Sequence, residues 1–471
     1  MVRAKFFARS AMAVALSLGV AVGGFSAADA KDKKQEAPKG PQLKPTEKFV
    51  KLYIPAAKAL EAAVKRPDVA AQRQKVVDAQ ARANAAKTKA ERQAAVADMT
   101  TQIAALQVLL QPEKALIDAA IAAGSNGDDK LVSGQLLVNY GNVAIDKNAQ
   151  KAGLQLQLDS GALPAENVAL VRYTLGRMAM DMGDMATAQR EIKLAVDGGY
   201  TKDESEFYLA NAYLLDKQIP LGLKLLHDAT VRNAAATPEY WIDNGLVQAF
   251  NNKLTGETNL IAGDLVTYYP SKQNWDRAIY VVTLINKYTT SDKIDLLRLR
   301  DRTGSFTEAD NYLDYMVYAS PNRLPAEVLR VVDLGIKSGM ITPATEIATD
   351  AGMSTVAKVQ ALAQGRLAED KNLLVVQERD ARGPKGNAKT ALSAGDAFLS
   401  HGMADKAEAM YRLALTMPGV DAGRAYLRLG IVLYDQAKYA EALDAFAKVT
   451  DARAPIAQLW TVQTRHKVAG K

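Results

Sequence analysis

The side chains that most often bind metals or take part in catalysis are scarce in this sequence. Cysteine is absent, and the three histidines, His227, His401 and His466, lie in different parts of the 471-residue chain. Because a metal centre or a catalytic triad needs several such groups that converge, this distribution predicts neither. The absence of cysteine also excludes disulfides and thiol catalysis.

Motifs for phosphate binding and hydrolysis are missing as well. The sequence contains no G-x-x-x-x-G-K-[ST], G-x-S-x-G or H-E-x-x-H pattern. Two carboxylates facing each other across a groove could still act as in glycoside hydrolysis. Most aspartates and glutamates, however, fall on surface faces or at helix starts. We therefore predict that the chain is not an enzyme and has no catalytic residues, no metal site and no cofactor.

The first thirty residues have the composition of a secretory signal peptide. Arg3, Lys5 and Arg9 precede an apolar run at 11–22, and small residues lead up to Ala30. This order of basic, apolar and small residues is typical of a segment removed during export. We expect cleavage after Ala30, a periplasmic or secreted product, and no transmembrane segment in the mature chain.

Residues 31–45 are rich in lysine, proline and glycine, which predicts a disordered linker. Beyond the signal peptide, 56 basic and 51 acidic side chains give the mature chain a net charge of +5. The basic residues are mixed with acidic ones, and none form a run that could follow a phosphate backbone. Nucleic acid is therefore not an expected partner.

Apolar residues recur with helical spacing through the rest of the chain, which predicts an all-α fold. The clearest example is 426–449, where two amphipathic segments flank a polar turn at 435–438. Gly430 and Ala442 are small at the positions where two helices would approach closely, and Phe446 would fill the space beside them. This pattern predicts a helix hairpin.

The same layout recurs thirty-five residues upstream and in a second tandem pair of units. The matching positions are Gly395, Phe398, Ala407, Tyr411 and Ala414, then Leu175, Gly176, Ala179, Ala188, Ile192 and Ala195, then Leu209, Ala210, Tyr213, Gly222, Leu226 and Ala229. This recurrence resembles the tetratricopeptide repeat (TPR) family. The resemblance covers 169–236 and 388–455 and implies an α-solenoid of TPR-like helix hairpins.

The remaining segments complete the predicted organisation. An Ala-rich helical hairpin or coiled-coil arm is expected at 46–123, since Val96, Met99, Ile103, Leu106 and Leu110 follow a heptad step. N-terminal TPR-like repeats are expected at 124–236, degenerate aromatic-rich helical repeats at 237–380, a linker at 381–387, and the C-terminal pair with a capping helix at 388–471. The arm could mediate self-association or partner docking, or simply pack as a cap.

In the TPR family, side chains from the first helix of each repeat line a groove that binds an extended peptide or a helix. The register assigns this position to Tyr173, Arg177, Met180, Asp181, Phe207, Asn211, Leu214, Asp396, Leu399, Arg424, Leu427, Ile431 and Tyr434. The alternative for any one of them is packing between repeats. The resemblance implies protein partners, and the signal peptide implies envelope or secreted ones.

The aromatic side chains of the central block suggest a second kind of partner. Tyr312, Tyr315 and Tyr318 step by three residues and could stack on sugar rings of an envelope polysaccharide, although core filling is the alternative. The sequence thus predicts a non-enzymatic protein–protein interaction scaffold in the bacterial cell envelope. A glycan-binding accessory protein for exopolysaccharide export or cell-wall handling is the alternative.

Overall fold

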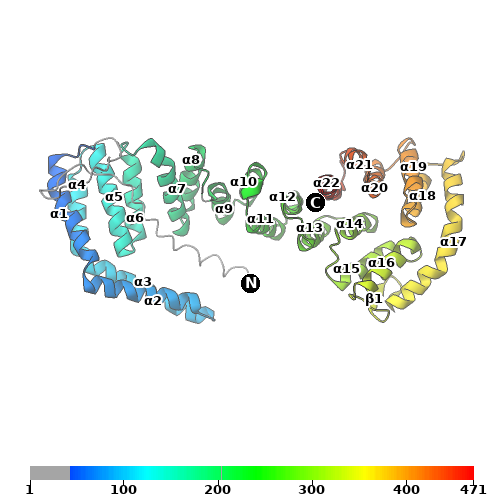
Figure 1. Ribbon diagram of the computed structural model, residues 1–471, viewed down its shortest axis with the longest axis horizontal. Coiled ribbons are helices and arrows are strands. Elements are labelled where there is room, and N and C mark those ends of the chain that lie inside the picture. The colour runs from blue at the N-terminus through cyan, green and yellow to red at the C-terminus, as the bar shows by residue number, and fades with distance from the viewer. Residues whose placement is uncertain (1–42, 203, 471) are drawn as a thin grey trace, which may run out of the picture. The chain divides into compact units, whose positions relative to one another are not determined.

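The computed structural model describes residues 43–202 and 204–470, which form two compact units that divide after Ala212. Helices make up most of both units (Figure 1). The all-α prediction is confirmed, apart from one short β-hairpin among the described residues. The predicted signal peptide and residues 31–42 of the predicted linker lie outside the described residues. Within the described residues, none of the helices has the length and apolarity to cross a membrane.

The first unit consists of an arm and the hairpins that follow it. Its helices are α1 (Glu47–Val64), α2 (Pro67–Ala85), α3 (Lys89–Leu109), α4 (Gln111–Ala123), α5 (Gly127–Ala144), α6 (Lys147–Asp159), α7 (Ala165–Asp181) and α8 (Met185–Asp197), followed by α9 (Ser205–Leu215) at the boundary. In the arm, α1 packs on α4 and α2 packs on α3, and then α5 pairs with α6 and α7 with α8.

The predicted arm is a real helical hairpin. Proline at the first position of α2 separates it from α1, and α3 begins at a capping box in which Thr88 and Glu91 exchange hydrogen bonds. On α3, Leu106 is buried as the heptad predicts, but Val96 is exposed. Ala95 takes the inward position instead, because only a small side chain fits against α2 there.

The hairpin formed by α7 and α8 has the close packing that the repeat pattern predicts. A Cβ added to Gly176 would lie 2.5 Å from Cγ1 and 2.9 Å from the backbone nitrogen of Ile192 on α8. Only glycine therefore permits this helix separation. Asp184 caps α8 by accepting a hydrogen bond from the Thr187 backbone N–H.

The second unit continues with further helix pairs. Its elements are α10 (Ile219–Arg232), a 3₁₀ turn (Ala234–Ala236), α11 (Glu239–Asn251), α12 (Thr255–Tyr268), α13 (Lys272–Ile285), α14 (Thr290–Thr303), α15 (Ala309–Ala319), α16 (Pro325–Lys337), β1 (Glu346–Thr349), β2 (Gly352–Thr355), α17 (Val356–Arg382), α18 (Ala388–Ser400), α19 (Ala404–Leu415), α20 (Ala422–Asp435), α21 (Tyr439–Phe446) and α22 (Ala454–Val468).

The degenerate central block keeps the repeat spacing despite its weak sequence pattern. Asn274 of α13 donates a 2.7 Å hydrogen bond to Glu239 of α11, and Arg277 of α13 pairs with Asp243 of α11 at 2.5 Å. The partners are 35 and 34 residues apart, as equivalent positions of successive repeats would be. The first helices of neighbouring hairpins are therefore side by side here.

One part of the central block departs from the helical prediction. Between α16 and α17 the chain forms an antiparallel pair of strands in which Ile347 lies opposite Ser354. The turn depends on Gly352, whose φ of 106° is accessible to glycine and strained for other residues. The long helix α17 then runs as far as Arg382 into the predicted linker, of which only the remainder lies between helices.

Candidate functional site

The predicted groove residues of α7 form an aromatic–arginine cluster with two tyrosines that follow them in the chain. Arg177 donates a 3.0 Å hydrogen bond to the Tyr173 hydroxyl, and its guanidinium carbon lies 3.2 Å from the centroid of the Tyr208 ring. Tyr173 also stacks on Tyr200 with centroids 4.7 Å apart. Arg177 is partly exposed, so this cluster combines a cation with aromatic surface at a face that solvent reaches.

The other predicted positions near this cluster differ in exposure. Asp181 is exposed at the end of α7, whereas Met180, Phe207, Asn211 and Leu214 are buried. The buried side chains fill the spaces between helices in this arrangement. Among these positions, Arg177 and Asp181 retain the most surface for a partner.

The corresponding face of the C-terminal pair is covered by the chain itself. Leu427 and Ile431 of α20 have no exposed surface, and Leu399 and Tyr434 are buried. The terminal helix α22 packs against α12, α14 and α20 and covers this face. Gln463 of α22 donates a 3.0 Å hydrogen bond to the Tyr434 hydroxyl. The prediction of an open groove is therefore wrong for Leu427 and Ile431.

A buried ionic network, formed by Asp295, Arg298, Glu327, Asp396 and Arg428, joins the C-terminal pair to the central block. Arg298 donates to both carboxylate oxygens of Glu327, at 2.9 and 2.8 Å, and to Asp295 at 2.8 Å. Arg428 of α20 contacts Asp295 at 3.1 Å and Asp396 at 2.6 Å. The predicted groove residue Asp396 is thus a structural partner of Arg428.

Both carboxylates at the ends of this network are held in the ionised form. Burial alone would raise the pKa of Glu327, but the charge and hydrogen bonds of Arg298 outweigh burial and lower the pKa to about 2. Burial likewise opposes ionisation of Asp396, and the charges of Arg428 and Arg424 lower its pKa. Trp460 of α22 completes the cover by donating its indole N–H to the Asp295 carbonyl oxygen at 3.0 Å.

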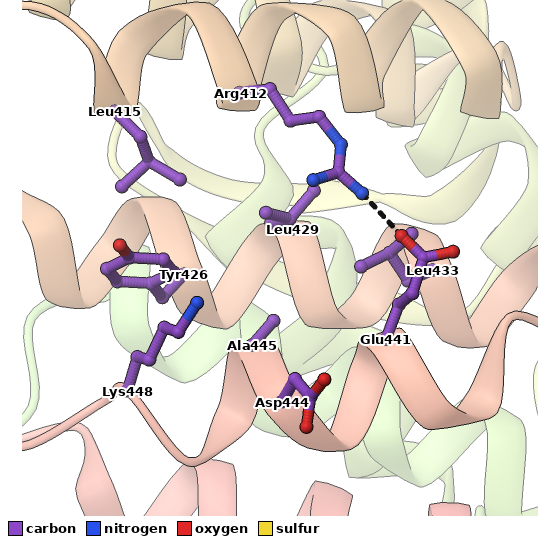
Figure 2. Close-up of a pocket in the computed structure, with 9 residues that line it drawn as sticks. All are labelled: Arg412, Leu415, Tyr426, Leu429, Leu433, Glu441, Asp444, Ala445 and Lys448. Carbon is purple, nitrogen blue, oxygen red and sulfur yellow. Dashed lines mark hydrogen bonds and ion pairs between the residues drawn. The ribbon is translucent and has the colours of Figure 1, made fainter.

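An open groove lies on another side of the C-terminal pair, between α19, α20 and α21 (Figure 2). Its volume is about 340 Å³. Its apolar floor is Leu415, Tyr426, Leu429, Leu433 and Ala445, and its charged rim is Arg412, Glu441, Asp444 and Lys448.

The rim of this groove carries ordered charges of both signs. Figure 2 shows the ion pair between Arg412 of α19 and Glu441 of α21, which measures 2.7 Å. The Lys448 ammonium lies 5.3 Å from the centroid of the Tyr426 ring. An apolar floor beside such a rim can bury an apolar side chain of a ligand and hold polar groups around it. Sequence reasoning used Leu429 and Leu433 only as packing residues and missed the space they border.

The chemistry-bearing side chains of the described residues have structural partners. His227 pairs with Asp264 at 2.7 Å, His401 pairs with Asp370 at 2.6 Å, and His466 lies 2.9 Å from the Val266 carbonyl oxygen. No group of three or more metal-binding side chains converges within the part of the chain that the structure describes.

The tyrosines considered for sugar stacking belong mainly to the core. Tyr315 has no exposed surface and donates its hydroxyl to Glu327 at 2.5 Å, while Tyr312 is buried and stacks on Phe306. Tyr318 is partly exposed. The predicted face of three tyrosines is therefore not available to a sugar ring, because two of its members fill the space between α14, α15 and α16.

Comparison with known proteins gives little further information. No family model matches the sequence, and no curated protein matches it. A chain from the solved structure titled "Crystal structure of APC/C hetero-tetramer Cut9-Hcn1" is similar, with 14% sequence identity and a TM-score of 0.22. The alignment covers 74% of this chain and 64% of the length of that chain. This likeness is too weak to support a conclusion, so the fold class rests on the helix pairs themselves.

Proposed function

We propose that this protein is a non-enzymatic protein–protein interaction scaffold of the bacterial cell envelope, exported by its N-terminal signal peptide. The groove between α19, α20 and α21 is the observation that carries the proposal. It is open and its floor is apolar, and its walls come from both hairpins of the best-defined repeat pair. Its partners would be segments of envelope or secreted proteins.

The shape and charge of the groove favour a protein segment as its ligand. A volume of about 340 Å³ falls within the range of about 300–1,000 Å³ that is usual for ligand sites. An amphipathic helix or extended segment could bury one apolar anchor against Leu429 and Tyr426. Its polar groups would then meet Arg412, Glu441 and Lys448, which fix the orientation.

Two features of the first unit support the same function. The aromatic–arginine cluster on α7 offers a second surface on which a partner could pack against Arg177. The arm between α1 and α4 exposes Val77 and Val96, which would suit self-association or docking. Both features extend the proposal without being required for it.

Affinity capture from the envelope fraction, with tagged mature protein and matched variants, tests the proposal. Arg412→Glu and Glu441→Arg each reverse one rim charge, while Arg379→Ala removes an exposed arginine of α17 as the control. We expect one stoichiometric protein partner with wild type and Arg379→Ala, and at least about a fivefold loss with each rim variant, as for about 1 kcal/mol of binding energy.

The contrary results are equally clear. The proposal would be wrong if the rim variants captured the same proteins as wild type in the same amounts. It would also be wrong if the mature protein captured only itself or only polysaccharide. In the second case the glycan-binding alternative would regain support, although its predicted tyrosine face is mostly buried.

A further inference from the structure

One arginine at the edge of the buried ionic network has no carboxylate partner among the described residues. Arg323 lies in the connection between α15 and α16 and is exposed. Its guanidinium donates a hydrogen bond to the Tyr318 carbonyl oxygen, which carries no formal charge. The positive charge of Arg323 is therefore not neutralised by an ion pair within residues 43–202 and 204–470.

The neighbouring arginine, Arg424 of α20, is only partly satisfied. It donates through one Nη to Asp396, and the same carboxylate oxygen also accepts a 2.6 Å hydrogen bond from Arg428. The Nε–H of Arg424 is buried and has no hydrogen-bond partner in the described part of the chain. A buried donor of this kind usually has a partner, so its isolation needs an explanation.

The charges around this edge do not balance. Four arginines, Arg298, Arg323, Arg424 and Arg428, surround three carboxylates, Asp295, Glu327 and Asp396. Burial and the like charges of Arg428, Arg298 and Arg424 lower the pKa of Arg323, against the opposing effect of Asp396. Arginine stays protonated at any physiological pH, so the site keeps one excess positive charge.

We propose that Arg323 and Arg424 bind an oxyanion, either a phosphate or a carboxylate group, at the exposed edge of the buried ionic network. Guanidinium groups recognise such anions through paired N–H donors, and both arginines have donors to spare. The anion would supply the missing negative charge. This site is separate from the groove between α19, α20 and α21 and does not depend on the proposed scaffold function.

Thermal unfolding of the purified mature protein tests the site. Sodium phosphate and sodium succinate are each compared with sodium chloride at equal ionic strength. We expect phosphate, succinate or both to raise Tm by about 2–4 °C above the chloride value in wild type. Arg379→Ala should keep this shift, because Arg379 is an exposed arginine elsewhere, on α17. Arg323→Ala and Arg323→Gln should lose it.

A second result separates a ligand site from a merely structural arginine. In chloride alone, Arg323→Ala should leave Tm unchanged or raise it slightly, because a charge repelled by three arginines is removed. A structural role would instead lower Tm in chloride. The proposal is overturned if neither anion stabilises wild type beyond chloride, or if the shift persists in both Arg323 variants. The relative effects of phosphate and succinate identify which anion the site prefers.

Discussion

The helices α7 and α20 begin repeats with the same sequence signature, and their hairpins are built alike. Gly176 of α7 faces Ile192, and Gly430 of α20 faces Phe446, whose ring carbon would lie 2.4 Å from an added Cβ. In both cases the absence of a side chain lets the two helices approach. The local pattern therefore has the same structural meaning in both units.

The outer faces of these two helices differ completely. On α7, Arg177 is partly exposed above two tyrosine rings. On α20, Leu427 and Ile431 are covered and Arg428 is buried against Asp295 of α14, 133 residues away in sequence. A repeat signature thus predicts the hairpin, but distant parts of the chain decide whether its face can bind a partner.

Breaking the buried ionic network should have the largest effect. Glu327→Gln leaves Arg298 buried beside a neutral amide, and we expect the free energy of unfolding to fall by about 3–5 kcal/mol. Urea unfolding of the second unit measures this loss. Glu369→Gln is the matched control, because Glu369 pairs with Arg366 in solvent on α17. Equal unfolding midpoints for the two variants would show that the network does not hold the C-terminal pair.

The network should also make stability depend on acid. The pKa of Glu327 is about 2 in the folded protein and near its ordinary value of 4.5 in the unfolded chain. Its stabilising contribution is therefore complete above pH 4.5 and is lost as the pH falls toward 2. The difference in stability between wild type and Glu327→Gln should shrink over that window.

The helix crossings should respond alike in the two units. Gly176→Ala and Gly430→Ala each place a methyl group where no space exists, and we expect each to cost about 1–3 kcal/mol. Gly176→Ala should cost more, because it meets backbone of α8, whereas the Phe446 ring can shift. Gly365→Ala in α17 meets no neighbouring atom of the described residues within 4 Å and should stabilise by about 0.5–1 kcal/mol. A neutral Gly176→Ala would contradict the close crossing.

The smallest effect belongs to a buried carboxyl group that opposes stability at neutral pH. Burial raises the pKa of Asp264 to about 6, although His227 acts in the other direction. A raised carboxyl pKa means that stability is highest near pH 4 and is lost as the pH rises through 6. Asp264→Asn should remove this dependence and exceed wild type at pH 8 by about 1–2 kcal/mol. Parallel stability–pH curves for the two proteins would contradict the assignment.

The sequence allowed the hairpins of both repeat pairs to be predicted, because small residues and apolar spacing are local signals. It also indicated the arm, except where Ala95 replaces Val96 at the inward position. The cover over α20 was not predictable, since Arg428 on an otherwise apolar helix gives no sign of Asp295 far upstream. The open groove was missed for a related reason. Its floor residues match the packing positions of the repeat, so their partial exposure depends on how α19 and α21 diverge.

The most direct test of which face is open uses single cysteines, which the sequence permits because it contains none of its own. Leu427→Cys probes the covered face of α20, and Glu441→Cys probes the rim of the groove. Labelling by a thiol reagent under native conditions should be fast at position 441 and at least about a hundredfold slower at position 427, since a buried site reacts only after opening. Equally fast labelling at both positions would show that α22 and α14 do not cover the repeat face.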